Sequence, residues 1–497
     1  MTPPHAQADD PRAALRRGVY LVLIAVAAGG ITGRLLAVNS VDLVRLEQHL
    51  NARARLAAGD GQPRLRNLQR PFLSGNDRSR WCTVRALVEH GTYAIDEIVV
   101  QPNWDTIDMV KHDGRGNPAP GPDEGHLYSS KPPLLATLMA GEYWLLHRLT
   151  GWTLGSHPYE LGRILLFTWN VLPFVGYLLI LAGMVERYGS TDFGRLFVVA
   201  AGALGTLVTS YAVAFTNHWP AACAAMLALD AALRIVVDGA RQPRWFLIAG
   251  TAAAFMAACE LPAISFALCL LALLGWKSPA LTLRAAAPGL IVFTAAAVGT
   301  NYLAHGTLQP AYAQRHVEGG WYDYQFRRGD RVIDSYWKPT TAKSEIDQGE
   351  PSRVAYAFHV LVGHHGIFSL TPVWLLSLAG LAMLLRKPTA PGDPALTGSR
   401  AIAAAILACT VVCLAFYIAR PLEDRNYGGM ATGFRWAIWF APLWLWGMLP
   451  AADALATTPR RRILAAVLLA ASVMTASYPT WNPWTQPWLQ VFWDFLA

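Results

Sequence analysis

The sequence predicts an all-α membrane protein that crosses the bilayer about eleven times, with interfacial helices in a large first outer loop. Of the 497 residues, 54% are hydrophobic and only 15% are charged, whereas soluble domains carry about 25% charged residues. Several apolar runs reach the roughly 20 residues that an α-helix needs to cross the hydrocarbon layer. These observations exclude a soluble globular protein.

The expected spans begin after a basic N-terminal segment, residues 1–17. The first apolar run, 18–37, is long and follows three arginines, which is typical of a retained span rather than a cleaved leader. An apolar segment at 131–151 is interrupted by charges and indicates a short embedded or interfacial helix. Ten more spans are expected at about residues 162–185, 193–214, 219–237, 245–260, 262–276, 285–303, 366–385, 401–418, 434–450 and 463–478.

Basic residues recur in alternate connections between these spans, the asymmetry that marks cytoplasmic loops. They are Arg187, Arg241 with Arg244, Lys277 with Arg284, Arg386-Lys387 and Arg460-Arg461-Arg462. The pattern predicts a cytoplasmic N-terminus and one transmembrane domain at 18–478. It places the loops 38–160 and 304–365 and the Trp-rich tail 479–497 on the outer side. It also accounts for the net charge of +8 without a nucleic acid partner.

The first outer loop contains a polar stretch, SGNDRSRWCTVRALVEHGTYAID, at residues 74–96. Apolar residues from Trp81 to Leu87 recur at helical spacing, so we expect an amphipathic helix that lies at the membrane surface. Asn76 suits the N-cap, and Asp77 falls in the first turn, where the helix dipole favours a carboxylate. Asp77 therefore has either a structural role at the helix start or a chemical one.

Two cations stand where polar loops meet apolar helices. Lys131 precedes two prolines in SSKPPLLATLMAGEYWLL, and Arg435 follows a glycine-rich stretch in NYGGMATGFRWAIWFAPLW. Lys131 would either extend to lipid headgroups or bind a specific phosphate. Arg435 would either lie alone at the interface or bind phosphate oxygens, with the glycines permitting close backbone approach.

Further polar residues at the outer ends of spans are candidates for lining a site. Glu260 lies in the turn between two short apolar runs, where a carboxylate is a functional candidate unless the turn is hydrated. The histidine pair in VGHHG lacks a third spaced ligand, and the six cysteines show no metal-binding spacing, so no metal site is predicted. The candidate lining residues are Arg80, Asn217, His218, Glu260, His364 and His365.

Three segments together resemble the C-type (GT-C) glycosyltransferase superfamily, multi-spanning enzymes that use polyprenyl-phosphate-linked sugars. They are NDRSRWCTVRALVEHGTYAID, SSKPPLLATLMAGEYWLL and GFRWAIWFAPLW. The pattern is most similar to the protein O-mannosyltransferase and aminoarabinose-transferase branch (glycosyltransferase family 39-like). The likeness extends over most of the chain in architecture, but its motifs cover only these three segments.

This resemblance implies a single inverting displacement at the anomeric carbon. Asp77 would be the general base, and Lys131 and Arg435 would bind the phosphate of the donor lipid. It further implies a bacterial inner-membrane enzyme with its site facing the periplasm, no cofactor, and an acceptor that is a lipid, a glycan or a protein.

The sequence departs from the family pattern at two places. Asp77 is followed by Arg78 where family members often have Asp-Glu, and Asn217-His218 stands where many carry an acid. Metal dependence is therefore not supported, and a non-catalytic relative stays open. A transporter or lipid-carrier flippase is the alternative, but it would favour internal repeats and charges within spans. No repeat is visible, and Asp230 is the clearest charge within a span. A structural or assembly protein is a third possibility.

Overall fold

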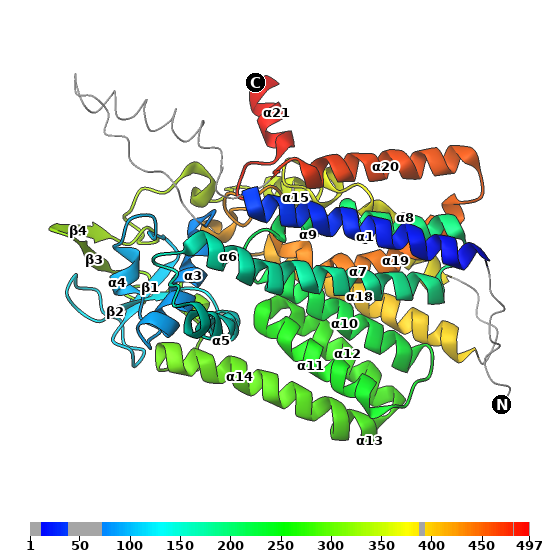
Figure 1. Cartoon of the computed structure of the whole chain (residues 1–497). Coiled ribbons are helices and arrows are strands. Elements are labelled where there is room, and N and C mark those ends of the chain that lie inside the picture. The colour runs from blue at the N-terminus through cyan, green and yellow to red at the C-terminus, as the bar shows by residue number, and fades with distance from the viewer. Residues whose placement is uncertain (1–10, 38–71, 387–392, 481, 497) are drawn as a thin grey trace.

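The computed structural model describes residues 11–37, 72–386, 393–480 and 482–496. Long helices run roughly parallel to one another, and most of the polar segments gather at one end of the bundle, the left-hand end of Figure 1. We call this end the polar end. The predicted fold class, a helical multi-pass membrane protein, is confirmed.

Helices occupy every place where a span is expected. Their bounds are α1 (Pro11–Ala37), α6 (Pro158–Leu166), α7 (Leu172–Tyr188), α8 (Asp192–Leu204), α9 (Leu207–Tyr211), α10 (His218–Val236), α11 (Pro243–Cys259), α12 (Ile264–Lys277), α14 (Ala287–His305), α17 (Trp374–Arg386), α18 (Pro394–Ile418), α19 (Ala441–Leu455) and α20 (Pro459–Ser477). Among the described residues, seven helical segments are long and apolar enough to cross a membrane, and three more are apolar but shorter. The number of spans stays a prediction.

Helix α10 forms the centre of the bundle. Nearly all of its side chains are buried, and it contacts α7, α11, α12, α18 and α19. Its many alanines allow these neighbours to approach closely. Asp230, the charge noted within this span, forms ion pairs with Arg187 and Arg234. Its position is therefore explained by structure, without a transport role.

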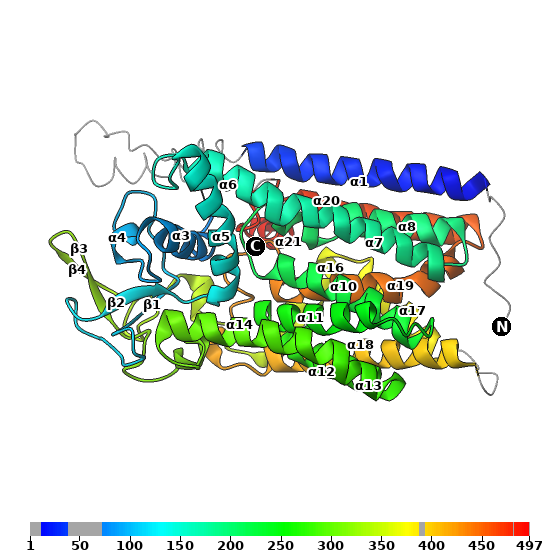
Figure 2. The ribbon, with the colours of Figure 1, turned by 60° about the horizontal axis from the view of Figure 1, so that its bottom comes forward.

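Helix α1 lies along one edge of the bundle (Figure 2). It packs against α7 and α8. Near its start, Arg16 binds two acids, with Nη2 2.8 Å from Glu186 Oε2 and Nη1 2.6 Å from Asp192 Oδ1. This contact holds a helix with few other buried polar groups against its neighbours.

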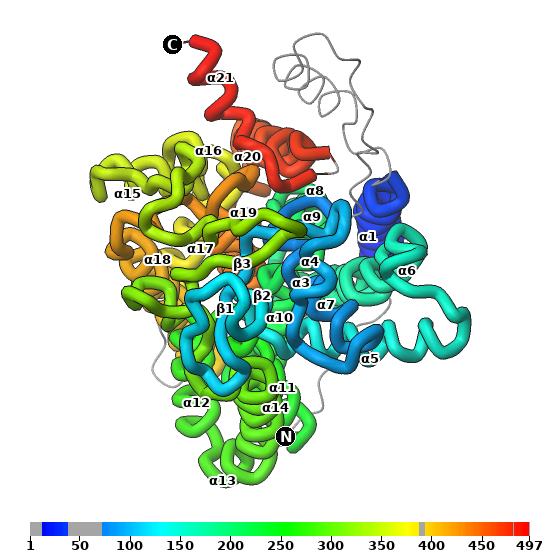
Figure 3. Tube along the Cα trace, turned by 90° about the vertical axis from the view of Figure 1, so that its left-hand side faces the viewer, coloured from blue at the N-terminus to red at the C-terminus, as the bar shows by residue number. Residues whose placement is uncertain are grey.

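The polar end contains the short elements of the chain, seen from in front in Figure 3. They are α3 (Gly75–Glu89), α4 (Asp96–Val99), β1 (Met109–His112), β2 (His126–Ser129), α5 (Pro133–Thr150), β3 (Gln325–Arg328) and β4 (Arg331–Asp334). Two further short helices, α15 (Arg353–Leu361) and α16 (Ile367–Leu370), pack against α18 and against α17 and α20, respectively. Strands β1 and β2 pair antiparallel with Met109 opposite Ser129, and β3 and β4 form a second hairpin. Helix α5 confirms the short helix expected at 131–151, and it packs against α3 and α14.

The last described helix, α21 (Trp488–Leu496), runs across the direction of α20 (Figure 1). Trp488 Nε1 donates to Thr475 Oγ1 of α20 at 2.9 Å. Phe495 on α21 is strongly exposed. Nine mostly apolar residues are too few to cross a bilayer, so this orientation suits a helix in the membrane interface.

Candidate active site

Helix α3 begins earlier than the sequence indicated. Ser74 is the N-cap, and its Oγ accepts a hydrogen bond from Asp77 N at 3.1 Å. Asn76 lies inside the first turn, where its Oδ1 accepts from Arg80 Nη1 at 2.7 Å. The prediction of Asn76 as the cap is therefore wrong, whereas the place of Asp77 in the first turn is confirmed.

The arginines of α3 do not form an exposed polar face, because every residue from Asp77 to Ala86 is buried. Arg78 donates to the carbonyl oxygens of Phe72 and Asp105, both at 2.8 Å. Arg85 pairs with Glu89 at 2.9 Å. A buried charge is tolerated only when it is paired or hydrogen-bonded. The helix is therefore packed on all sides rather than along one apolar stripe.

Asp77 connects α3 to the turn that precedes α10. Its Oδ1 accepts from Trp81 Nε1 at 2.9 Å and from Phe215 N at 3.1 Å, and its Oδ2 accepts from Leu73 N at 3.3 Å. Oδ2 therefore has one donor and keeps a lone pair for another proton. Burial raises the pKa of Asp77 to about 6, against the lowering effect of its N–H partners and of Arg80. The carboxyl group is ionised at neutral pH and is a stronger base than an exposed aspartate.

Asn217, the N-cap of α10, and His218, its first residue, bring two distant arginines together. We call this start of α10, where the preceding turn ends, the 217–218 turn. Asn217 Oδ1 accepts from Arg80 Nε at 2.8 Å, and His218 Nε2 accepts from Arg435 Nη1 at 3.1 Å. His218 Nδ1 lies 2.5 Å from Glu260 Oε1. Because an arginine only donates, His218 Nε2 must be unprotonated, and neutral His218 then carries its proton on the side of Glu260.

Arg435 begins the 3₁₀ helix η8 (Arg435–Phe440). Its Nε donates to Gly428 O at 2.8 Å, and its guanidinium lies 4.9 Å from the ring centre of Trp484. Gly428 has a φ of 94°, and a Cβ there would lie 2.9 Å from Arg435 Nε. The glycine is needed both for this backbone conformation and for the close approach of the arginine.

Lys131 is buried and does not extend to the membrane surface. Its Nζ lies 3.0 Å from Asp108 Oδ1. Burial alone would raise the pKa of Asp108, but Lys131, with Arg435 and Arg315, lowers it. Asp108 is therefore a charged partner that lies within electrostatic reach of both Lys131 and Arg435. Sequence reasoning missed this residue because it stands in an irregular loop with no periodic pattern and no motif.

His364 and His365 lie behind the Arg435 segment rather than beside the turn. Their Nδ1 atoms are 2.5 Å apart, and His365 stacks on Tyr427 with ring centres 4.7 Å apart. The carbonyl of His365 accepts from Phe434 N at 3.3 Å. Burial lowers the pKa of His364 to about 4. Among the described residues, no group of three His, Cys, Asp or Glu side chains is placed to hold a metal ion.

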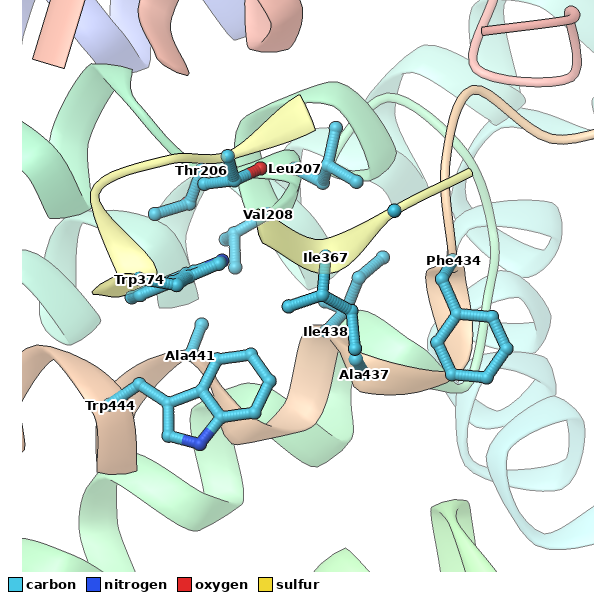
Figure 4. A pocket seen from close by; sticks show the side chains of 12 residues that line it. Thr206, Leu207, Val208, Ile367, Trp374, Phe434, Ala437, Ile438, Ala441 and Trp444 are labelled. Atoms are coloured by element: carbon cyan, nitrogen blue, oxygen red, sulfur yellow. The ribbon is translucent and has the colours of Figure 1, made fainter. Parts of the chain in front are cut away.

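An apolar cavity lies next to the segment that carries Arg435. The cavity is small, with a volume of about 30 Å³. Figure 4 shows Trp374 and Trp444 on one side and Phe434, the residue before Arg435, on another. Its other lining residues are Thr206, Leu207, Val208, Gly366, Ile367, Thr371, Ala437, Ile438 and Ala441. The lining is mostly apolar, but the space is about that of two water molecules and is too small for a hydrocarbon chain.

Comparisons with known proteins name no family for this chain. No family model matches the sequence, and no curated protein matches it. An oligosaccharyltransferase of Archaeoglobus fulgidus in the apo form is 12% identical, with a TM-score of 0.45 over 96% of this chain and 57% of that chain. The archaeal oligosaccharyltransferase AglB from Archaeoglobus fulgidus, in complex with an inhibitory peptide and a dolichol-phosphate, is 11% identical, with a TM-score of 0.44 over 94% and 56%.

The chain thus spans little more than half the length of these two proteins. TM-scores of 0.45 and 0.44 assign neither a family nor an activity to this chain. The function therefore rests on the residues of this chain.

The structure brings most of the sequence candidates together at the polar end. Asp77, Arg80, Asn217, His218, Glu260 and Arg435 are joined by direct contacts around the 217–218 turn. Lys131 is reached through Asp108, and the two histidines stand apart. A carboxylate with a raised pKa and several cations close to it together suit a substrate that has an anionic group.

Proposed function

We propose that the protein is a membrane glycosyltransferase that moves a sugar from a polyprenyl-phosphate-linked donor to a hydroxyl or amine of an acceptor. The observation that carries this proposal is the contact of Asp77 and Arg435 with the same short turn, 215–218. The three motif segments, with their resemblance to the O-mannosyltransferase and aminoarabinose-transferase branch, support it. The distribution of basic residues supports an outward-facing site.

The proposed reaction is one inverting displacement. The acceptor oxygen or nitrogen attacks the anomeric carbon while Asp77 takes its proton, and the bond from that carbon to the phosphate oxygen breaks. The electron pair leaves with the lipid phosphate, where negative charge develops. Lys131 and Arg435 would stabilise that charge without transferring a proton.

The direct test is consumption of a radiolabelled polyprenyl-phosphate sugar by the purified protein in lipid nanodiscs. A transferase cleaves the donor and releases polyprenyl phosphate, whereas a flippase moves the intact lipid. Recovery of only intact donor, with a range of hydroxyl and amine acceptors present, would contradict the proposed activity. Transfer of the label between the leaflets of vesicles would then favour the flippase alternative.

The rate of transfer should rise with pH as Asp77 ionises. Because burial raises the pKa of Asp77 to about 6, log kcat/KM should increase by about one for each pH unit below that value and level off above it. The same shift makes the folded protein less stable as pH rises from about 4 to about 6, because the unfolded chain ionises this group more readily. A kinetic midpoint near pH 4, as for an exposed aspartate, would contradict Asp77 as the base.

Replacing Lys131 with Ala should weaken donor binding by about tenfold to a hundredfold, the range for a lost hydrogen bond to a charged group. This variant leaves Asp108 unpaired, which also costs folding free energy. The double variant K131M/D108N removes both charges and serves as the control for stability. Donor affinity measured by calorimetry should fall in both variants, whereas the melting temperature should recover in the double variant. An unchanged donor affinity in K131M/D108N would exclude Lys131 from the phosphate site.

A further inference from the structure

Two pairs of adjacent residues, 217–218 and 259–260, hold the two arginines of the candidate site. The 217–218 turn supplies the acceptors, since Asn217 accepts from Arg80 and His218 accepts from Arg435. Asn217 Nδ2 in turn donates to Cys259 O at 3.0 Å, and His218 Nδ1 contacts Glu260. The side chains of Asn217, His218 and Glu260 are all buried. Asn217 is therefore fixed from behind by a hydrogen bond, and His218 is backed by a close contact with Glu260.

Both guanidinium groups use the same two nitrogens, Nε and Nη1, for these contacts. Arg80 donates through Nε to Asn217 and through Nη1 to Asn76, and Arg435 donates through Nε to Gly428 and through Nη1 to His218. Within the described part of the chain, Nη2 of neither arginine donates a hydrogen bond. A guanidinium is planar, so fixing Nε and Nη1 also fixes the direction of the N–H groups on Nη2.

The acceptors in the 217–218 turn are neutral. An amide oxygen and a neutral imidazole orient a guanidinium without cancelling its charge, whereas a carboxylate would form an ion pair with it. The acid Glu260 stands one residue further away, behind the imidazole. Burial lowers the pKa of Arg80; the nearby charge of Arg435 adds to this effect, whereas Tyr312, Asp108 and Asp77 oppose it. Two cations held close together with their charges retained form a site that favours an anion.

We propose that Asn217, His218 and Glu260 are positioning residues that hold Arg80 and Arg435 so that the Nη2 groups of both arginines bind the phosphate of the lipid donor. This rests on the proposed function, in which the donor carries a phosphate. It adds Arg80 to the cations of the site, and it gives the 217–218 turn a role that requires neutral acceptors. The phosphate would gain donors from two planar groups whose direction is set before it binds, which reduces the entropy cost of binding.

The decisive variant is Asn217→Asp, because it keeps an oxygen acceptor of the same size and adds a negative charge. The aspartate still accepts from Arg80 but loses the hydrogen bond to Cys259 O, so some stability is lost. With a purely structural role, the variant that folds would keep its affinity for the phosphate. The proposal requires the opposite result for the ligand, since the new charge opposes a phosphate. At the second position, His218→Gln keeps a neutral acceptor and His218→Glu adds a charge.

The probe is a short-chain polyprenyl phosphate without a sugar, titrated by calorimetry into the purified full-length protein in nanodiscs. We expect N217D and H218E to weaken binding by about tenfold or more, and H218Q to stay within about threefold of the parent. The uncharged prenol of equal length should bind all variants alike, and an equal concentration of inorganic phosphate should not displace the lipid. Melting temperatures are measured for every variant.

An N217D variant that folds and binds polyprenyl phosphate with unchanged affinity would overturn the proposal. If N217D does not fold, H218E is compared with H218Q instead. Equal affinities of these two variants for polyprenyl phosphate would overturn the proposal. The result is separable from that of the proposed function. If the lipid phosphate binds in a charge-dependent way but no sugar is transferred, the phosphate site is supported and the transferase activity is rejected. If sugar is transferred but N217D and H218E bind the phosphate as the parent does, the transferase activity is supported and this phosphate site is rejected.

Discussion

Replacing Asp77 with Asn should lower sugar transfer by about a hundredfold or more, the usual contribution of a general base. The amide is nearly the same shape, so the contact with Phe215 N can be kept, but it cannot accept the proton of the acceptor. Steady-state transfer from the radiolabelled lipid donor at pH 8 measures the loss. Binding of the donor should change much less than kcat, because the carboxylate acts on the acceptor proton rather than on the phosphate.

The matched control is Asp96→Asn, which also lies at the polar end. Asp96 accepts from Leu127 N at 2.9 Å and lies 3.4 Å from His126 Nδ1, away from the 217–218 turn. We expect D96N to retain nearly the parent activity. If D77N transfers sugar as fast as the parent protein, Asp77 is not the base. It then has only a structural role at the start of α3.

Replacing Arg435 with Ala should reduce kcat/KM by about a hundredfold to a thousandfold, as removal of a fixed donor to a developing negative charge does. Arg435→Lys should restore little of this. A single ammonium group cannot donate to Gly428 O and His218 while also reaching a phosphate, whereas the guanidinium has five N–H groups in a fixed fork. Rates at several donor concentrations separate the effect on kcat from that on KM.

A suitable control for the arginine is Arg328→Ala. It removes the same charge from the exposed β3–β4 hairpin, at the left-hand end of Figure 1. Its kinetics should match the parent enzyme within about twofold, since surface charges contribute little. If R435K proves as active as the parent, the fork geometry is not used, and a general positive charge at this position suffices.

The sequence predicts the helical elements well, because their signals are local. Apolar runs mark the spans, the prolines after Lys131 mark the start of α5, and the glycines before Arg435 mark a close backbone approach. The cap of α3 was placed wrongly because Ser74, Gly75 and Asn76 all suit that position, and only the backbone conformation of Ser74 decides between them.

Other features depend on contacts between distant segments, which no local pattern records. The arginines of α3 looked like a hydrated face, yet Arg78 and Arg85 are buried because carbonyl oxygens and Glu89 receive their N–H groups. The pairing of Lys131 with Asp108 likewise joins the start of α5 to an irregular loop. The number of spans, the roles of the candidate residues and the domain boundaries stay predictions.

The 217–218 turn also sets the order in which the protein becomes competent during synthesis. Its contact with Arg80 reaches back 137 positions in the chain, and its contact with Arg435 reaches forward 217 positions. A nascent chain that has inserted its first spans holds Asp77 and Arg80 but lacks the second arginine. The proposed phosphate site is therefore complete only after the segment that begins with Arg435 has joined the bundle.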